Sequence, residues 1–214
     1  MSARDLRSRV ERRLHKASAT HVRPEQVDQL CAYFGLLANW NKRLNLTALS
    51  VDPPTDEAID RLLVEPTAAL QVIDAGDSSL IDLGSGGGSP AIPMKIGAPQ
   101  LKLVMVEAKA RKSAFLRDAI RQLGLAGAQV ENARFEHLLT RSELHEASDI
   151  VSVRAVRPDR QLWNPVLAFL KPGGRVLWFG SAGLEAHAVP LEFRVASTQP
   201  LPGSSQLIVL KRVG

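Results

Sequence analysis

The hydrophobic pattern of the chain changes near residue 75. Before it, apolar side chains recur every three or four positions, which is the spacing of helices that bury one face. Helices are expected over residues 2–17, from Pro24 to about residue 40, and over 56–72, where Pro66 can interrupt the last one. We therefore expect residues 1–75 to form a helical N-terminal extension that faces RNA.

From residue 79 onward, short apolar runs alternate with helical stretches, which predicts a mostly parallel sheet. The last two apolar runs follow each other without a helix between them, so they predict a terminal antiparallel hairpin. The chain thus predicts an α/β domain over residues 76–214. Its strands are expected at 79–83, 101–106, 128–131, 150–153, 175–179, 192–197 and 206–212, with helices at 90–97, 110–123 and 160–170.

The composition is that of a globular protein with a sizeable core. Of the 214 residues, 45% are hydrophobic, and the mean hydropathy is −0.04. No run reaches the ~18 apolar residues of a membrane span, and the first residues lack the apolar segment of a signal peptide. The single cysteine, Cys31, cannot form an internal disulfide. We expect a cytoplasmic monomer with no membrane partner.

Basic residues outnumber acidic ones, with a net charge of +5 and a pI of about 9.7. This balance suits a polyanionic partner, because phosphate neutralisation drives non-specific nucleic-acid affinity. Any one basic cluster can equally be a solvated helix face, but three clusters together favour RNA. They are Arg4 to Lys16, Lys109 to Arg121 after the second strand, and Arg154, Arg157 and Arg160 after the fourth.

A glycine-rich loop follows the first strand, with glycines at positions 84, 86, 87 and 88. Glycine has no Cβ, so a ligand can lie against the main chain. The loop stands at the carboxyl end of a strand, where ligands bind in open α/β sheets. After it, Ser89 is expected to be the N-cap of a helix and Pro90 its first residue.

Two cofactors are compatible with this loop. Gly86 to Ala91 fits the dinucleotide fingerprint, but Pro90 then stands where a helical N–H should face a pyrophosphate. The other register, Asp82-x-Gly84-x-Gly86-x-Gly88, resembles the first motif of S-adenosylmethionine-dependent methyltransferases. Glu107, at the end of the second strand, can accept ribose hydroxyls in either case. The Lys-Pro-Gly-Gly at 171–174 and the terminal hairpin resemble the class I methyltransferase fold, which favours S-adenosylmethionine.

The absence of certain motifs narrows the choice of methyl acceptor. Methylation of an exocyclic amine often accompanies an Asn/Asp-Pro-Pro-aromatic run after the fourth strand, and this chain has Ser152 to Pro158 there. Methylation of pyrimidine C5 needs a cysteine thiolate, and Cys31 lies in the helical extension. Guanine N7 already carries a lone pair, so it needs alignment with the methyl donor rather than a general base.

Several segments together resemble the bacterial RsmG family, also called GidB, whose members methylate guanine N7 in 16S ribosomal RNA. The resemblance lies in five stretches: 40–47, 82–94, 107–116, 133–136 and 154–155. It implies a class I, Rossmann-like methyltransferase fold with a seven-stranded mixed sheet. It also implies S-adenosylmethionine as cofactor and the small ribosomal subunit, or an assembly intermediate of it, as partner.

The resemblance assigns roles residue by residue. Arg154 is expected near both cofactor and acceptor and is the candidate catalytic residue, while Phe135 and Glu136 are expected near the adenine ring. No metal is implied. The full cofactor set is Asp82, Gly84, Gly86, Gly88, Ser89, Glu107, Ala108, Lys109, Phe135, Glu136 and Arg154, and the RNA-binding set is Asn45, Arg61, Arg111 and Lys112.

The chain departs from the family pattern at four places. They are Ser89-Pro90-Ala91 in place of a bulky residue and Pro-Gly, Leu62 in place of a histidine, Glu65-Pro66 in place of Asp-Ser, and Phe179 in place of a lysine. Two alternative functions therefore stay open. One is a methyltransferase for a small metabolite, and the other is an RNA-binding protein with weakened catalysis.

Overall fold

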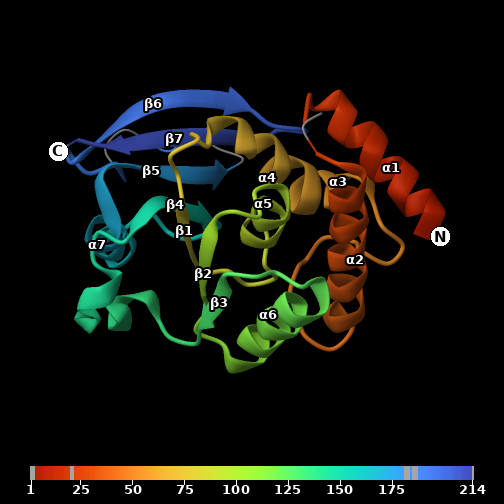
Figure 1. Ribbon diagram of the computed structural model, residues 1–214, viewed down its shortest axis with the longest axis horizontal. Coiled ribbons are helices and arrows are strands. Elements are labelled where there is room, and N and C mark those ends of the chain that lie inside the picture. The colour runs from red at the N-terminus through yellow and green to blue at the C-terminus, as the bar shows by residue number, and fades with distance from the viewer. Residues whose placement is uncertain (1–2, 20–21, 181–183, 185–187, 214) are drawn as a thin grey trace.

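The computed structural model describes residues 3–19, 22–180, 184 and 188–213. In this part of the chain, seven strands form one sheet with helices on both faces (Figure 1). The strands are β1 Ser79–Leu83, β2 Lys102–Val106, β3 Ala128–Glu131, β4 Ser148–Arg154, β5 Leu170–Gly180, β6 Phe193–Pro200 and β7 Gln206–Arg212. The α-helices are α1 Ala3–Lys16, α2 Pro24–Asn41, α3 Asp56–Ile59, α4 Glu65–Ala68, α5 Ala91–Gly97, α6 Ala110–Leu123 and α7 Arg160–Phe169.

The strand order is β3-β2-β1-β4-β5-β7-β6. The first five strands of the chain pair in parallel, whereas β7 is antiparallel to β5 and β6 is antiparallel to β7. The predicted mixed sheet and terminal hairpin are therefore confirmed. Several strands extend beyond their predicted bounds. The fifth begins at Leu170, because that residue pairs with Ser148 of β4.

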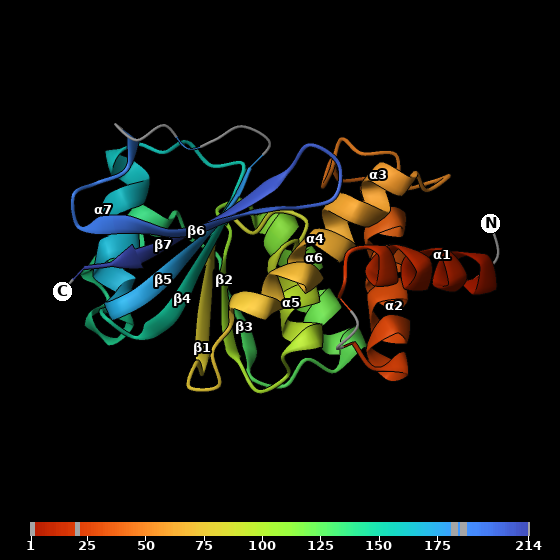
Figure 2. The same cartoon turned by 90° about the horizontal axis from the view of Figure 1, so that it is seen from above.

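Helices lie on both faces of the sheet (Figure 2), and an apolar core fills the space on each face. Because side chains alternate along a strand, Leu80 of β1 packs with the N-terminal helices, α5 and α6. Ile81 and Leu83 face the other side and pack with α7. The larger core runs without interruption from α1 and α2 into the sheet, so packing crosses the predicted boundary at residue 75. That boundary stays a prediction.

The third predicted helix, 56–72, is a run of four helical segments. After α3 come a π-helix, η1 Asp60–Val64, then α4, then a 3-10 turn, η2 Ala69–Val72. Within η1 the N–H of Glu65 donates to the carbonyl of Asp60, five residues back. The run passes through Pro66 without a break, because Pro66 stands in the first turn of α4. No helix in the described part is long and apolar enough to span a bilayer.

The predicted cap of α5 is wrong. The helix begins at Ala91, with Pro90 as its N-cap, and Ser89 makes no capping hydrogen bond. Instead the Ser89 hydroxyl donates to the carbonyl of Leu62 at 3.0 Å. The hydroxyl oxygen accepts from Arg154 Nη1 at 3.2 Å, so the arginine takes the place that a helix amide would have in a cap.

Candidate functional site

The sheet changes its direction of growth between β1 and β4. The chain builds outward from β1 to β2 and β3, then returns to place β4 on the other side of β1. Ligands of open α/β sheets bind at the carboxyl ends of the strands that flank such a switch point. A cavity of about 670 Å³ opens there, within the ~300–1,000 Å³ range of small-molecule sites. Among its lining residues are Leu46 to Leu49, Glu57, Arg61, Gly84 to Gly87, Ser89, Glu107, Lys109, Lys112, Arg154 and Ala155.

The glycine loop turns back over the end of β2. Its backbone enters the left-handed region at Gly84 (φ +79°) and Gly86 (φ +51°), where side chains are disfavoured. The amides of Gly84 and Ser85 both donate to the Val106 carbonyl, at 2.9 and 3.0 Å. The loop is thereby held against the strand that ends in Glu107.

Glu107 connects the loop to the start of α6. One carboxylate oxygen accepts from the Gly86 amide at 2.9 Å, and the other accepts from the Lys109 amide at 2.7 Å. The side chain lines the cavity and is only 8% exposed. A carboxylate oxygen has more than one lone pair, so each can accept a further hydrogen bond from a ligand hydroxyl. This placement suits ribose recognition.

Asp82 lies beneath the loop rather than in the cavity wall. It is 1% exposed, and one carboxylate oxygen accepts from the Ser152 hydroxyl at 2.6 Å, which joins β1 to β4. The other oxygen has no hydrogen-bond partner among the described residues. Burial raises the pKa of Asp82, and the Ser152 hydrogen bond opposes that rise. In this position, Asp82 can support the loop by connecting β1 to β4.

The N-terminal extension forms the wall opposite the sheet. The Tyr33 hydroxyl, buried in α2, donates to the Gly87 carbonyl at 2.6 Å. Burial raises the pKa of Tyr33, so the hydroxyl keeps its proton and stays a donor. The Asn41 side chain accepts from the amides of Leu46 and Thr47, which orders the segment that borders the cavity. Sequence reasoning missed Tyr33, since its position next to Phe34 looks like part of an ordinary buried stripe.

Arg154 closes the side of the cavity at the end of β4. Its Nη1 donates to the Arg61 carbonyl and to the Ser89 hydroxyl, and its Nη2 donates to Glu65 Oε2 at 2.9 Å. The guanidinium carbon lies 4.7 Å from the ring centre of Phe179. Burial lowers the pKa of Arg154 to about 10, against the opposing charge of Glu65.

The residue after Arg154 also departs from regular geometry. Ala155 has a φ of +57° and lines the cavity. A non-glycine residue held in this region costs of order 1–3 kcal/mol, and such strain concentrates at functional sites. It supports placing the site here.

The structure brings together about half of the residues predicted from the sequence. Those that line the cavity are Arg61, Gly84, Gly86, Ser89, Glu107, Lys109, Lys112 and Arg154. Outside the lining are Asn45, Asp82, Gly88, Ala108, Arg111, Phe135 and Glu136. Phe135 is half-buried against the core on the α7 face, and Arg111 borders a different cavity beside Trp40. The ligand-binding roles of both groups stay predictions.

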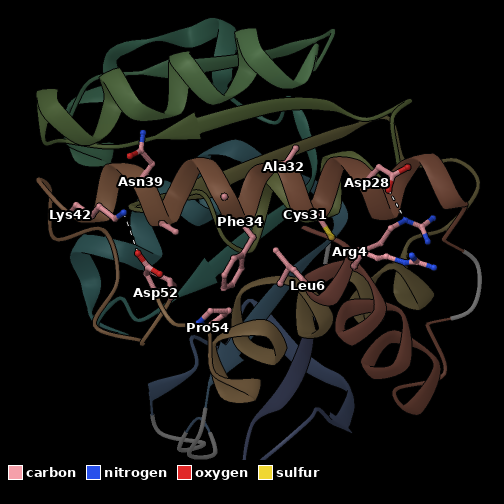
Figure 3. A pocket seen from close by; sticks show the side chains of 14 residues that line it. Arg4, Leu6, Asp28, Cys31, Ala32, Phe34, Asn39, Lys42, Asp52 and Pro54 are labelled. Atoms are coloured by element: carbon pink, nitrogen blue, oxygen red, sulfur yellow. Dashed lines mark hydrogen bonds and ion pairs between the residues drawn. The ribbon is translucent and has the colours of Figure 1, made fainter. Parts of the chain in front are cut away.

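A second cavity, of about 700 Å³, lies between α1, α2 and the segment 51–54 (Figure 3). Its wall is apolar at Leu6 and Phe34, and ion pairs flank it, Arg7 with Asp28 and Lys42 with Asp52. Its lining includes no residue of the strands or of the glycine loop. Within the described residues, no group of three or more His, Cys, Asp or Glu could hold a metal ion.

Comparisons with known proteins point to one family. The family model GidB, described as rRNA small subunit methyltransferase G, matches residues 26–200. A protein of Paracoccus denitrificans is 39% identical over 149 residues, which cover 70% of this chain and 73% of that protein. One of Xanthomonas campestris is 34% identical over 192 residues, covering 86% and 85%. Both are named ribosomal RNA small subunit methyltransferase G.

Solved structures share the fold. TrmN from Thermus thermophilus superimposes with a TM-score of 0.54 at 21% identity, covering 69% of this chain and 49% of that one. A mutant of MtNAS, in complex with S-adenosylmethionine, gives a TM-score of 0.53 at 11% identity and covers 97% and 73%. At these identities the likeness concerns the fold alone.

Substitution of Gly84 tests whether the glycine loop binds the ligand. A Cβ there would lie 3.1 Å from Val156 Cγ2 at a φ of +79°. Gly124 is a matched control, with a φ of +62° and nothing within 4 Å of the added Cβ. Each alanine variant should lower the free energy of unfolding by about 1–2 kcal/mol. Only Gly84→Ala should weaken binding of S-adenosylhomocysteine in calorimetry, by about tenfold or more, which corresponds to ~1.4 kcal/mol. Equal affinities in the two variants would place the ligand elsewhere.

Proposed function

The chain belongs to the GidB family of rRNA small subunit methyltransferases, and we propose that it methylates N7 of a guanine in 16S ribosomal RNA with S-adenosylmethionine as donor. The observation that carries this proposal is the cavity at the switch point. Bare glycine backbone and the Glu107 carboxylate form one side of it, and Arg154 lies on another. The proposed substrate is the small ribosomal subunit or an assembly intermediate of it. The protein is proposed to act on it as a monomer in the cytoplasm.

The cavity fits the methyl donor by its chemistry. The left-handed backbone at Gly84 leaves room for the methionine and ribose portions, and Glu107 presents a fixed carboxylate for the ribose hydroxyls. Phe135 and Glu136 are the proposed adenine contacts. When bound, S-adenosylmethionine supplies a methyl group on a positively charged sulfur.

The acceptor chemistry makes a general base unnecessary. Guanine N7 carries no proton, so methyl transfer to it requires no proton removal. Glu107 already accepts two backbone N–H groups, Asp82 is buried under the loop, and Glu57, which also lines the cavity, needs no part in proton removal. What the protein must supply is alignment of the two reactants, which can contribute about 7–11 kcal/mol of the barrier.

The mouth of the cavity is suited to phosphate. Arg61, Lys109 and Lys112 line the cavity, and Arg111 lies beside Lys112 on the first turn of α6. These cations can neutralise backbone phosphates on either side of the target nucleotide. Asn45 is exposed on the loop that precedes the lining segment and is a further proposed RNA contact.

Methyl transfer from labelled S-adenosylmethionine tests the function directly. Small subunits and naked 16S ribosomal RNA from a strain lacking the gene are incubated with the protein, and the RNA is digested to nucleosides. We expect the label in 7-methylguanosine. Label in another nucleoside would overturn the N7 assignment, and label only in small molecules would make the protein a metabolite methyltransferase. Tight RNA binding without transfer would make it an RNA-binding protein.

The proposed phosphate contacts predict that RNA binding weakens as the salt concentration rises. Each lysine that contacts a phosphate should contribute to this dependence. Replacement of Lys112 by glutamine should reduce the slope of log binding constant against log salt by about 0.7–0.9 for one lost phosphate contact. Lys102 is the control, because it is exposed at the amino end of β2, away from the cavity. Titration of RNA at several salt concentrations measures both slopes. An unchanged slope for Lys112→Gln would contradict the proposed path of the RNA.

A further inference from the structure

We propose that Glu65 is a positioning residue for Arg154, and that Glu65 and Pro66 together form the cradle that fixes the Arg154 guanidinium beside the target guanine. The inference rests on the proposed function, because it assigns how one candidate residue of that site is held. Glu65-Pro66 is also one of the places where the chain departs from the family pattern.

Three of the five N–H donors of the Arg154 guanidinium bond to the protein. Of the five N–H donors of an arginine, those on Nη1 bond to the Arg61 carbonyl and the Ser89 hydroxyl. Nη2 bonds to Glu65, and the Nε is buried with no hydrogen-bond partner among the described residues. Phe179 covers one face of the group. A side chain so restrained is unsuited to following a mobile phosphate, and it suits the fixed orientation of a planar base.

Pro66 explains why the Arg61 carbonyl is available. In the π-helix the amide of Glu65 donates to Asp60, five residues back. The next bond of that ladder would run from residue 66 to the carbonyl of Arg61, but proline has no N–H. The carbonyl left over accepts from Arg154 instead. A residue with an N–H at position 66 would compete for the same oxygen.

Glu65 supplies the charge that keeps Arg154 in place. Its side chain is 1% exposed, and its carboxylate lies one helical turn from the Arg61 carbonyl, so the two acceptors hold the guanidinium from neighbouring turns. The Asp82 carboxylate also favours the charged form of Arg154, whereas the Arg61 side chain opposes it. Breaking a buried ion pair leaves a charge without compensation, so removal of the Glu65 charge should release the guanidinium from its orientation.

A double-mutant cycle tests this inference. Glu65→Gln should lower kcat about 10–100-fold, because a small misplacement of an orienting group can cost ~10²-fold. The KM for RNA and the affinity for S-adenosylhomocysteine should change less than about threefold. Glu65→Asp should recover part of kcat, and Glu65→Gln should add nothing in an Arg154→Gln background. An unchanged kcat in Glu65→Gln, or a double variant whose loss is the product of the single losses, would overturn the proposal.

Asp149→Asn is the matched control, since its carboxylate is paired with Lys171 near the start of β4, at the other end of the strand from Arg154. It should lower thermal stability without lowering kcat. Side-chain NMR with nitrogen-labelled arginine gives a readout that does not depend on activity. The Arg154 Nη protons should be resolved in the wild type and averaged by rotation in Glu65→Gln. If they stay resolved, the cradle does not depend on Glu65. If the wild type fails to methylate guanine while the NMR difference appears, the proposed function fails and the positioning role stands.

Discussion

The hydrogen bonds that fix the conformation of the glycine loop are the constraint on which the rest of the site depends. A loop with four glycines in five positions has high conformational freedom when unfolded, so its shape must be imposed by neighbours. Glu107 holds it through the Gly86 amide, and Tyr33 holds it through the Gly87 carbonyl. One support comes from the sheet and the other from the N-terminal helices. The cavity is therefore shaped jointly by two parts of the chain that look independent in the sequence.

Arg154 is likewise held by residues from both the sheet and the N-terminal helices. The arginine ends a central strand, but its partners Arg61 and Glu65 belong to the helical run before the sheet. Phe179, from the next strand, lies under the guanidinium. Glu65 and Phe179 thus contact the same side chain from two different parts of the chain.

The sequence predicts the order and type of the sheet elements well because those follow from local periodicity. The bounds of β1, β3 and α6 agree with the predictions, and Gly124 ends α6 in a left-handed conformation as a stop signal should. Contacts between distant segments escape such reasoning. Ser89 has the composition of a helix cap, yet its hydroxyl bonds to Leu62, 27 positions earlier. The sequence suggests only that Tyr33 is a core residue, whereas in the structure its hydroxyl donates a hydrogen bond to the Gly87 carbonyl.

A crystal structure with bound S-adenosylhomocysteine tests the central claim most directly. We predict that the ribose hydroxyls lie within hydrogen-bond distance of the Glu107 carboxylate and that the homocysteine portion lies against the backbone of the glycine loop. Its sulfur should face the side of the cavity where Arg154 lies. A nucleoside bound between α1 and α2, or a ribose that does not contact Glu107, would contradict it.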